Sequence, residues 1–186
     1  MEAYLRKYND KVFAIAGGYR FAVPGEKVEL NASRSFDRNN LPLKSTEWKL
    51  SDGTIVNNSV TSITYNEPGI YSEELTVETK DGYTDRDFLY VTVYDTSGVN
   101  KTASGWAYYY PVRGIKAGDE VIFWNRLTGT ISDVMINFGD DSSWETIGEQ
   151  TTHIFKEAGK FVITLKSTGP ANAPVTLKME IVVEEK

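Results

Sequence analysis

One pattern occurs twice in this chain of 186 residues. The segment ITYNEPGIYSEELTV begins at residue 63, and HIFKEAGKFVITLKS begins ninety positions later. In both, an aromatic residue is followed by a polar residue, Glu, a small residue and Gly, then by a second aromatic residue and a Leu. Such self-similarity indicates a duplicated unit. The matched residues are Tyr65, Gly69, Tyr71 and Leu75 in the first copy and Phe155, Gly159, Phe161 and Leu165 in the second.

A second match lies upstream of each copy. Trp48 and Leu50 correspond to Ile136 and Phe138, eighty-eight positions further on, with the two extra residues in the loop after FGDDSS. We therefore expect Trp48 and Ile136 to occupy equivalent core positions of two like domains. The chain length suits two domains of about 90 residues each.

The segment between the two copies has the composition of a linker. TSGVNKTASG, residues 96–105, is small and polar and contains two glycines, which favours a flexible connection. We predict one domain at residues 11–95 and a second at 106–186. Residues 1–10 form an N-terminal extension, which we interpret as a short helical turn or a ragged end.

Both copies have the rhythm of antiparallel β-structure. Turn signals such as Pro-Gly, Asp-Gly and Gly-Asp recur about every 8–12 residues, and apolar residues alternate between them, which is typical of a β-sandwich. Gly17 and Gly18 predict a bend in the first strand. We predict an all-β fold with no long helix. Alternation assigns these residues to the interior: Val28, Leu30, Ala32, Trp48, Leu50, Ile63, Tyr65, Leu75, Val77, Leu89, Val91, Val93, Val121, Phe123, Val134, Ile136 and Phe138.

Composition excludes several functional classes. The net charge is -6, so a nucleic-acid partner is not expected. No run of about 18 apolar residues is present, and we expect no membrane insertion. Cysteine is absent, which removes disulfides and thiolate sites. Residues 1–10 do not resemble a secretion signal, which leaves open a cytoplasmic protein, a mature form or a part of a longer chain.

Both copies resemble the PKD domain, an immunoglobulin-like β-sandwich named after polycystic kidney disease proteins. The first copy has GEKV, SRSFD, WKLSDG and EPGIYSEEL, and the second has GDEV, INFGDD, HIF and EAGKFVITL. The first departs from the family pattern at LSDG and at Ile63, where a His is frequent. The second departs by lacking the Ser-x-Ser-x-Asp loop and by Asp141 and Ala158 in place of Gly and Pro.

The resemblance implies a setting and a role. PKD domains occur mostly in extracellular proteins, where they act as spacers or as modules that contact proteins or carbohydrates, and no catalytic residues are attributed to them. The resemblance therefore implies two tandem immunoglobulin-like sandwiches at the cell surface or outside the cell. The partners that the resemblance implies are other domains of the parent protein, and a polysaccharide or a cell-surface protein.

An enzymatic site would have to use a small set of residues. His153 is the single histidine and would be the base for Ser142 or Ser143 in a nucleophilic site, but it falls where the family has a structural His. A glycosidase needs two carboxyls that face each other, whereas Glu73 and Glu74, adjacent on a strand, point to opposite faces. Asp85 with Asp87 and Asp140 with Asp141 are the other pairs. We expect no enzymatic activity and no obligatory cofactor.

Two acidic loops could supply oxygen ligands for calcium. The loop FDRNN offers Asp37, Asn39 and Asn40, and GDDSSWE offers Asp140, Asp141, Ser142 and Glu145. Neither loop matches an EF-hand, and Asp and Asn are also ordinary turn residues. Calcium is therefore a minor hypothesis.

The aromatic residues suggest a binding surface. In WAYYYPV, Trp106, Tyr108 and Tyr110 alternate, so an extended strand places them on one face about 7 Å apart. Trp124 and Trp144 could extend this row. The rings could stack on sugars, or they could fill a core or an interface. We expect burial, because an open row of large rings is unusual on a soluble protein.

Two functions follow. The first is a non-catalytic spacer and protein-interaction module of a larger extracellular or cell-surface protein. The second is a carbohydrate-binding module attached to a secreted glycoside hydrolase. Burial of the aromatic row would favour the first function, and a contiguous exposed row would favour the second.

Overall fold

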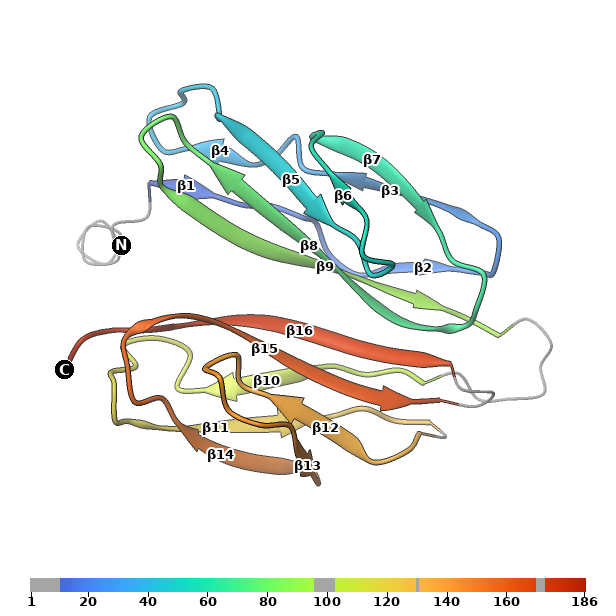
Figure 1. Cartoon of the computed structure of the whole chain (residues 1–186). Helices are drawn as coiled ribbons and strands as arrows, with labels where there is room; N and C mark the ends of the chain where they lie inside the picture. The colour runs from blue at the N-terminus through green and yellow to red at the C-terminus, as the bar shows by residue number, and fades with distance from the viewer. Residues whose placement is uncertain (1–10, 96–102, 130, 170–172) are drawn as a thin grey trace. The chain divides into compact units, whose positions relative to one another are not determined.

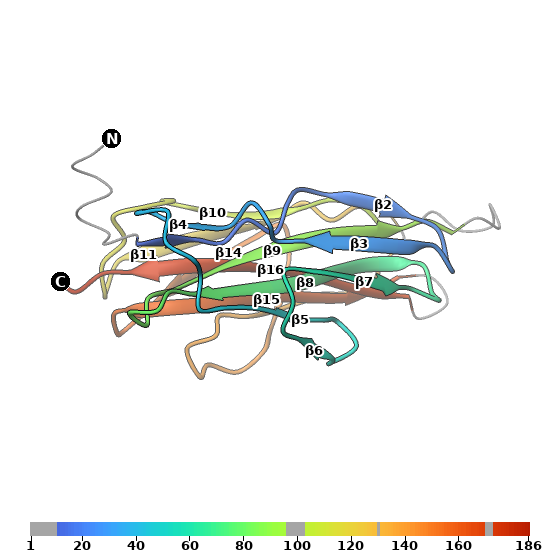
Figure 2. The same cartoon turned by 90° about the horizontal axis from the view of Figure 1, so that it is seen from above.

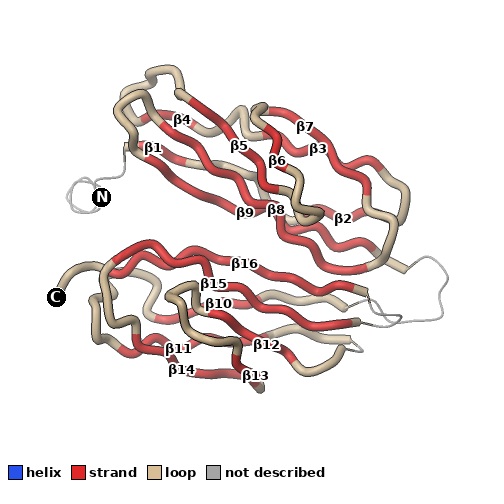
Figure 3. The backbone as a smooth tube through the Cα atoms, viewed as in Figure 1, coloured by secondary structure: helices blue, strands red, loops and turns tan. Residues whose placement is uncertain are grey.

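The computed structural model describes residues 11–95, 103–129, 131–169 and 173–186. These residues form strands and turns and no helix (Figure 3). It follows that the described residues include no helix that could cross a membrane. The predicted extension at residues 1–10 and most of the predicted linker lie outside the described residues. The chain divides into two compact units, the first within residues 1–90 and the second containing residues 91–186 together with the short segments 21–26 and 65–71.

The N-terminal half contains nine strands among its described residues, and the pairings between these strands whose register is resolved are antiparallel (Figure 1). One sheet contains the order β8-β5-β6, with β9 beside β8 and β2 beside β9, while β3 pairs with β7 and β1 with β4. The strands are β1 (Val12–Phe13), β2 (Arg20–Ala22), β3 (Lys27–Asn31), β4 (Phe36–Asp37), β5 (Ser45–Lys49), β6 (Ile55–Val56), β7 (Val60–Thr64), β8 (Gly69–Glu78) and β9 (Thr84–Val93).

The core of this half forms where alternation predicts it. Trp48 on β5 lies opposite Leu75 on β8, and both are completely buried. Leu30 on β3 is buried to the same degree. Strand β3 presents alternate side chains to the interior, as the period of two of a strand requires, whereas β8 and β9 also bury neighbouring residues. Burying large apolar side chains away from water is the main stabilising contribution to such a fold.

The C-terminal half contains two sheets (Figures 1 and 2). A three-stranded sheet has the order β10-β11-β14, and the strands β13-β12-β15-β16 lie next to one another in the second. Adjacent strands within each set are antiparallel. The strands are β10 (Ala107–Tyr110), β11 (Glu120–Asn125), β12 (Val134–Asn137), β13 (Glu145–Ile147), β14 (Gln150–Ile154), β15 (Gly159–Thr168) and β16 (Pro174–Val183).

Aromatic residues join the two sheets of this half. The ring of Phe123 on β11 lies 5.2 Å from that of Phe138, which directly follows β12. Phe155, just after β14, meets Phe138 edge-on at 6.5 Å. All three side chains are buried to 1% exposure or less. Tilted and edge-to-face contacts of this kind stabilise a core beyond the area they bury, and here they close a β-sandwich.

The duplication is visible in strand register. Trp48 pairs with Leu75 in the first half, and Ile136 pairs with Leu165 in the second. Trp48 and Ile136 are both completely buried, which confirms the predicted equivalence. The pairing of β3 with β7 is likewise equivalent to that of β11 with β14. Val28 lies opposite Ile63 in the first pair, and Val121 lies opposite His153 in the second.

The predicted bend at Gly17 is present, with a φ of 104° that favours glycine.

The structure also contains elements that alternation does not predict. Strand β4, however, lies in a segment predicted to be a polar loop, and β6 and β13 are similarly short. Strands of two or three residues are too short to repeat the alternation of a strand, so a sequence pattern cannot reveal them.

Candidate functional site

The aromatic row lies on the solvent side of β10. The exposed fractions are 55% for Trp106, 41% for Tyr108 and 62% for Tyr110. Tyr109, between them, points inward, and its hydroxyl donates a hydrogen bond to the backbone oxygen of Glu180 at 3.0 Å. Since Tyr109 takes the inward position of the strand, its neighbours must face outward. The expectation that the row would be buried is therefore wrong.

Trp124 extends the row, whereas Trp144 does not. The half-buried Trp124 on β11 lies opposite Tyr108, and their rings stack at 5.0 Å with an interplanar angle of 14°. Trp144 follows β12, in the other sheet, and is 41% exposed. The ammonium group of Lys166 lies 5.1 Å from the centre of its ring. Of the five predicted ligand-binding aromatics, four come together on one face.

We call this surface the aromatic face and define it by the outward residues of β10, β11 and β14. Strand register places Tyr108, Trp124 and Gln150 in one row across the sheet, and Tyr110, Ile122 and Thr152 in the next. Trp106 precedes β10, and its backbone oxygen accepts a hydrogen bond from Arg126 N–H at 3.0 Å. Gln150 and Thr152 are exposed. The face therefore combines large rings with neutral hydrogen-bonding groups.

The corresponding surface of the N-terminal half is polar. Because Val28 matches Val121 in register, Glu29 and Asn31 of β3 occupy the positions of Ile122 and Trp124. Here the strands β3 and β7 form a shallow depression of about 470 Å³, lined by Lys27, Glu29, Val60, Thr61 and Ser62. The same sandwich thus forms without aromatic residues at these positions, so the fold does not require them.

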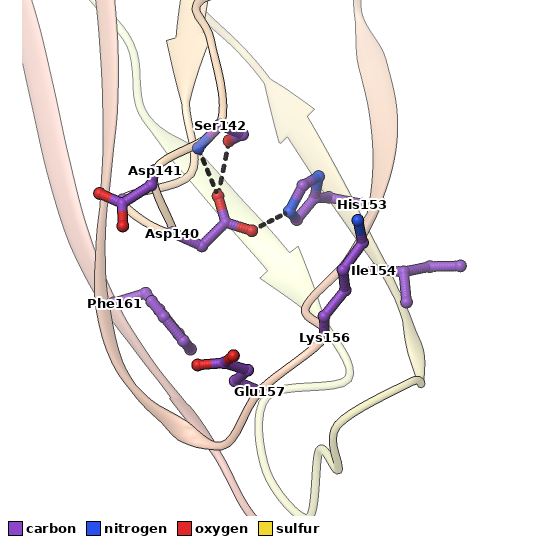
Figure 4. Close-up of a pocket in the computed structure, with 9 residues that line it drawn as sticks. Asp140, Asp141, Ser142, His153, Ile154, Lys156, Glu157 and Phe161 are labelled. Carbon is purple, nitrogen blue, oxygen red and sulfur yellow. Dashed lines mark hydrogen bonds and ion pairs between the residues drawn. The ribbon is translucent and has the colours of Figure 1, made fainter.

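A second candidate site surrounds Asp140 in the C-terminal half (Figure 4). It is a pocket of about 440 Å³ between the turn after β12 and the end of β14. The Oδ2 atom of Asp140 lies 2.7 Å from Nε2 of His153, and its Oδ1 atom accepts a hydrogen bond from the Ser142 hydroxyl at 2.6 Å. The imidazole of His153 stacks on Phe138 at 3.8 Å.

The hydrogen bonds to Asp140 control its ionisation. Burial by itself would raise the pKa of this carboxyl group, but hydrogen bonds from Ser142 and the interaction with His153 outweigh burial and hold the pKa below its ordinary value. The ionised carboxylate is therefore the stable form in this site.

The order of these three residues does not match that of a nucleophilic triad. A serine nucleophile must donate its hydroxyl hydrogen to the histidine, and the carboxylate must orient that histidine from behind. In this pocket the carboxylate lies in the middle, and the Ser142 hydroxyl donates to Asp140. The arrangement holds the turn after β12 on β14. Asp52, at the matching position of the N-terminal half, accepts a hydrogen bond from Thr54 N–H within its own turn at 2.8 Å.

The two glutamates of β8 point to opposite faces, as predicted. Glu73 is completely buried and accepts hydrogen bonds from the backbone and the hydroxyl of Ser51 at 2.7 and 2.6 Å. Glu74 forms an ion pair with Arg86 at 2.9 Å. The two carboxylates therefore do not converge on a substrate position.

Asp85 and Asp87 of β9 hold the segment that follows β1. Ala14 N–H donates to Asp85 and Ala16 N–H donates to Asp87, each at 2.8 Å. Burial raises the pKa of Asp87, against the effect of its hydrogen bonds. The sequence does not predict this role, because the contacts join residues that are far apart in the chain.

The two acidic loops use their side-chain oxygens within the chain. Asp37 accepts a hydrogen bond from Asn39 N–H at 2.7 Å, and Asn40 adopts a positive φ of 58°. Both oxygens of Asp140 are engaged as described above, while Asp141 and Glu145 are exposed. Within the described part of the chain, no group of three or more His, Cys, Asp or Glu side chains could hold a metal ion.

Comparison with known proteins identifies the two halves. PKD domain models match residues 11–93 and residues 106–183. No curated protein sequence matches the chain. Solved structures with a similar arrangement include the fibronectin(III)-like modules of Clostridium thermocellum CbhA, at 15% identity over 94% of each chain with a TM-score of 0.33.

Two further structures are similar at the same level. One is a structure described under the carbohydrate-binding modules of the β-sandwich superfamily. It is 14% identical over 94% of this chain and 84% of the other, with a TM-score of 0.41. The other is a Ca²⁺-stabilised adhesin with which an Antarctic bacterium binds ice, at 12% identity over 94% and 50%, with a TM-score of 0.35. At these scores the family assignment rests on the PKD domain matches.

Proposed function

Because the chain belongs to the PKD domain family, with two such domains in tandem, we propose that it is a non-catalytic spacer and protein-interaction module of a larger extracellular or cell-surface protein. PKD domains are non-catalytic modules, and the geometry around His153 agrees with that role, since Asp140 separates it from the Ser142 hydroxyl. Its partners would be other domains of the parent protein and a ligand at the cell surface.

The aromatic face is the observation that supports the interaction part of the proposal, and not the spacer part. Trp106 and Tyr110 are more than half exposed, and the first domain has Glu29 and Asn31 at the positions of Ile122 and Trp124. Large exposed apolar surface on a soluble protein usually marks an interaction site. Tyr and Trp are also enriched in binding interfaces. The face therefore supports an interaction function for the second domain.

The same exposure favours the second candidate function, a carbohydrate-binding module that serves an attached secreted glycoside hydrolase. A contiguous row of open rings is what this function requires, whereas a purely mechanical spacer requires none. The two candidates share the face and differ in the chemistry of the ligand.

Binding and turnover measurements on the intact chain test the proposal. We expect no hydrolysis of glycan or peptide substrates, and retention on an array of extracellular proteins and glycans that is weakened in the double variant Trp106→Ala, Tyr110→Ala. Turnover that disappears in His153→Ala would contradict the non-catalytic role. Equal retention of the chain and the double variant would contradict the role of the face.

A further inference from the structure

The centre of the aromatic face carries no formal charge. Across its two central rows, Tyr108, Trp124 and Gln150 are followed by Tyr110, Ile122 and Thr152. Charged residues lie only toward the ends of β11, at Glu120 and Arg126, and Arg126 forms an ion pair with Glu149 at 3.5 Å. A nucleic acid or an acidic polymer needs several cationic groups to neutralise its own charge. The charge distribution therefore matches an uncharged ligand.

The ring arrangement indicates a ligand longer than one sugar. Trp106 and Tyr110 are four residues apart, which corresponds to about 13 Å along an extended strand. The stacked pair of Tyr108 and Trp124 lies beside the middle of this span. Since a single pyranose covers a single aromatic ring, contact with both outer rings requires a chain of sugars.

We propose that the aromatic face binds an uncharged polysaccharide. This inference rests on the second candidate function and specifies the ligand of the same face as uncharged. Sugar rings stack by their C–H faces on Trp106 and Tyr110, because aromatic faces are apolar and gain from covering apolar surface. The exposed side chains of Gln150 and Thr152 supply donors and acceptors for the hydroxyl groups. A few polar groups placed among aromatic ones are typical of sites that recognise small polar units.

Affinity electrophoresis of the intact chain tests the proposal, in gels that contain an uncharged β-glucan, a galactomannan or the acidic polygalacturonate. We expect at least one uncharged polysaccharide to retard the chain. Trp106→Ala and Tyr110→Ala should each weaken the binding about three- to tenfold, as expected for the loss of one aromatic contact. Trp144→Ala is the control, since it removes an exposed ring that lies outside the aromatic face, and it should not change the retardation.

The outcomes separate this inference from the proposed function. The proposal is overturned if no uncharged polysaccharide retards the chain, or if Trp106→Ala and Tyr110→Ala bind as well as the unaltered chain while keeping its melting temperature. If the face variants instead lose binding to polygalacturonate or to a protein on the array, the ligand class is wrong and the interaction function stands. If the face binds no ligand of any of these classes, both are wrong.

Discussion

Asp140 stabilises the second domain through its charge. Its folded-state pKa is lowered, so its stabilising contribution is present above the ordinary carboxyl pKa of about 4 and is lost as the pH falls through the lowered value. Acid should therefore weaken the turn that the carboxylate shares with Ser142 and His153. We expect this pH dependence in the stability of the domain, since Ser142, Asp140 and His153 are not arranged as a catalytic triad.

We predict that Asp140→Asn lowers the free energy of unfolding of the second domain by about 1 kcal/mol at pH 7, because a charge-assisted hydrogen bond becomes a neutral one. Urea unfolding at pH 7, 5 and 3 should show a smaller acid loss for the variant than for the unaltered chain. Asp141→Asn is the control, since Asp141 is exposed at a φ of 64° that Asn tolerates. Equal acid losses for Asp140→Asn and the unaltered chain would contradict the prediction.

The pKa of Asp87 is shifted in the opposite direction to that of Asp140. Burial raises its pKa, so its contribution to stability is fully present below the ordinary pKa of about 4 and decreases as the pH rises through the raised value. Its ionised form is costly at neutral pH, although it accepts a hydrogen bond from Ala16 N–H.

Asp87→Asn should therefore keep or slightly raise the stability of the first domain at pH 7, since an amide oxygen can accept the same hydrogen bond without a buried charge. Asp87→Ala should lose about 1–3 kcal/mol, because Ala16 N–H would lose its acceptor. Thermal melts of both variants at pH 7 check this prediction. A large loss in Asp87→Asn would show that the charge itself stabilises the strand.

At the scale of the elements, β5 and β12 are the equivalent central strands of the two domains. Trp48 and Ile136 are completely buried on them, and each lies opposite a buried Leu of the neighbouring strand. The indole Nε1 of Trp48 is buried without a hydrogen-bond partner among the described residues. The contribution of Trp48 therefore comes from packing and not from its polar atom.

We predict that Trp48→Ala costs about 3–5 kcal/mol and Ile136→Ala about 2–5 kcal/mol in denaturant melts. Trp48→Phe should cost less, because it removes a buried N–H that has no partner while keeping most of the ring. A loss below about 1 kcal/mol for Trp48→Ala would mean that this strand does not pack as described.

Alternation in the sequence predicts most of these strands. It predicts which face of a strand is buried only where one face is apolar and the other is polar. The positions of Trp48 and Ile136 could be predicted, since each belongs to a run in which one face is apolar and the other is more polar. β10 has aromatic residues on both faces, and its orientation follows from the contacts of Tyr109 with the ring of Phe123 and the backbone of Glu180. These contacts join separate strands of the fold, so the exposure of Trp106 could not be predicted. The pairing of Asp140 with His153 is non-local for the same reason.

The chain contains two domains of one family, and the second carries the aromatic face. The domain boundaries at residues 95 and 106 remain a prediction. Ser104 forms a bridge with Thr128 through two backbone hydrogen bonds, of 3.1 and 2.7 Å. Ala103 before it is only 2% exposed. A separately expressed second domain should therefore begin no later than residue 103.

Expression of residues 11–95 and of residues 103–186 as separate proteins tests the central claim that each copy of the repeat is a complete sandwich. The measurement is the amide NMR spectrum of each piece beside that of the intact chain. The account predicts a dispersed spectrum for both pieces, because each has its own buried core around Trp48 or Ile136. Collapsed spectra for both pieces, beside a dispersed spectrum for the intact chain, would contradict it.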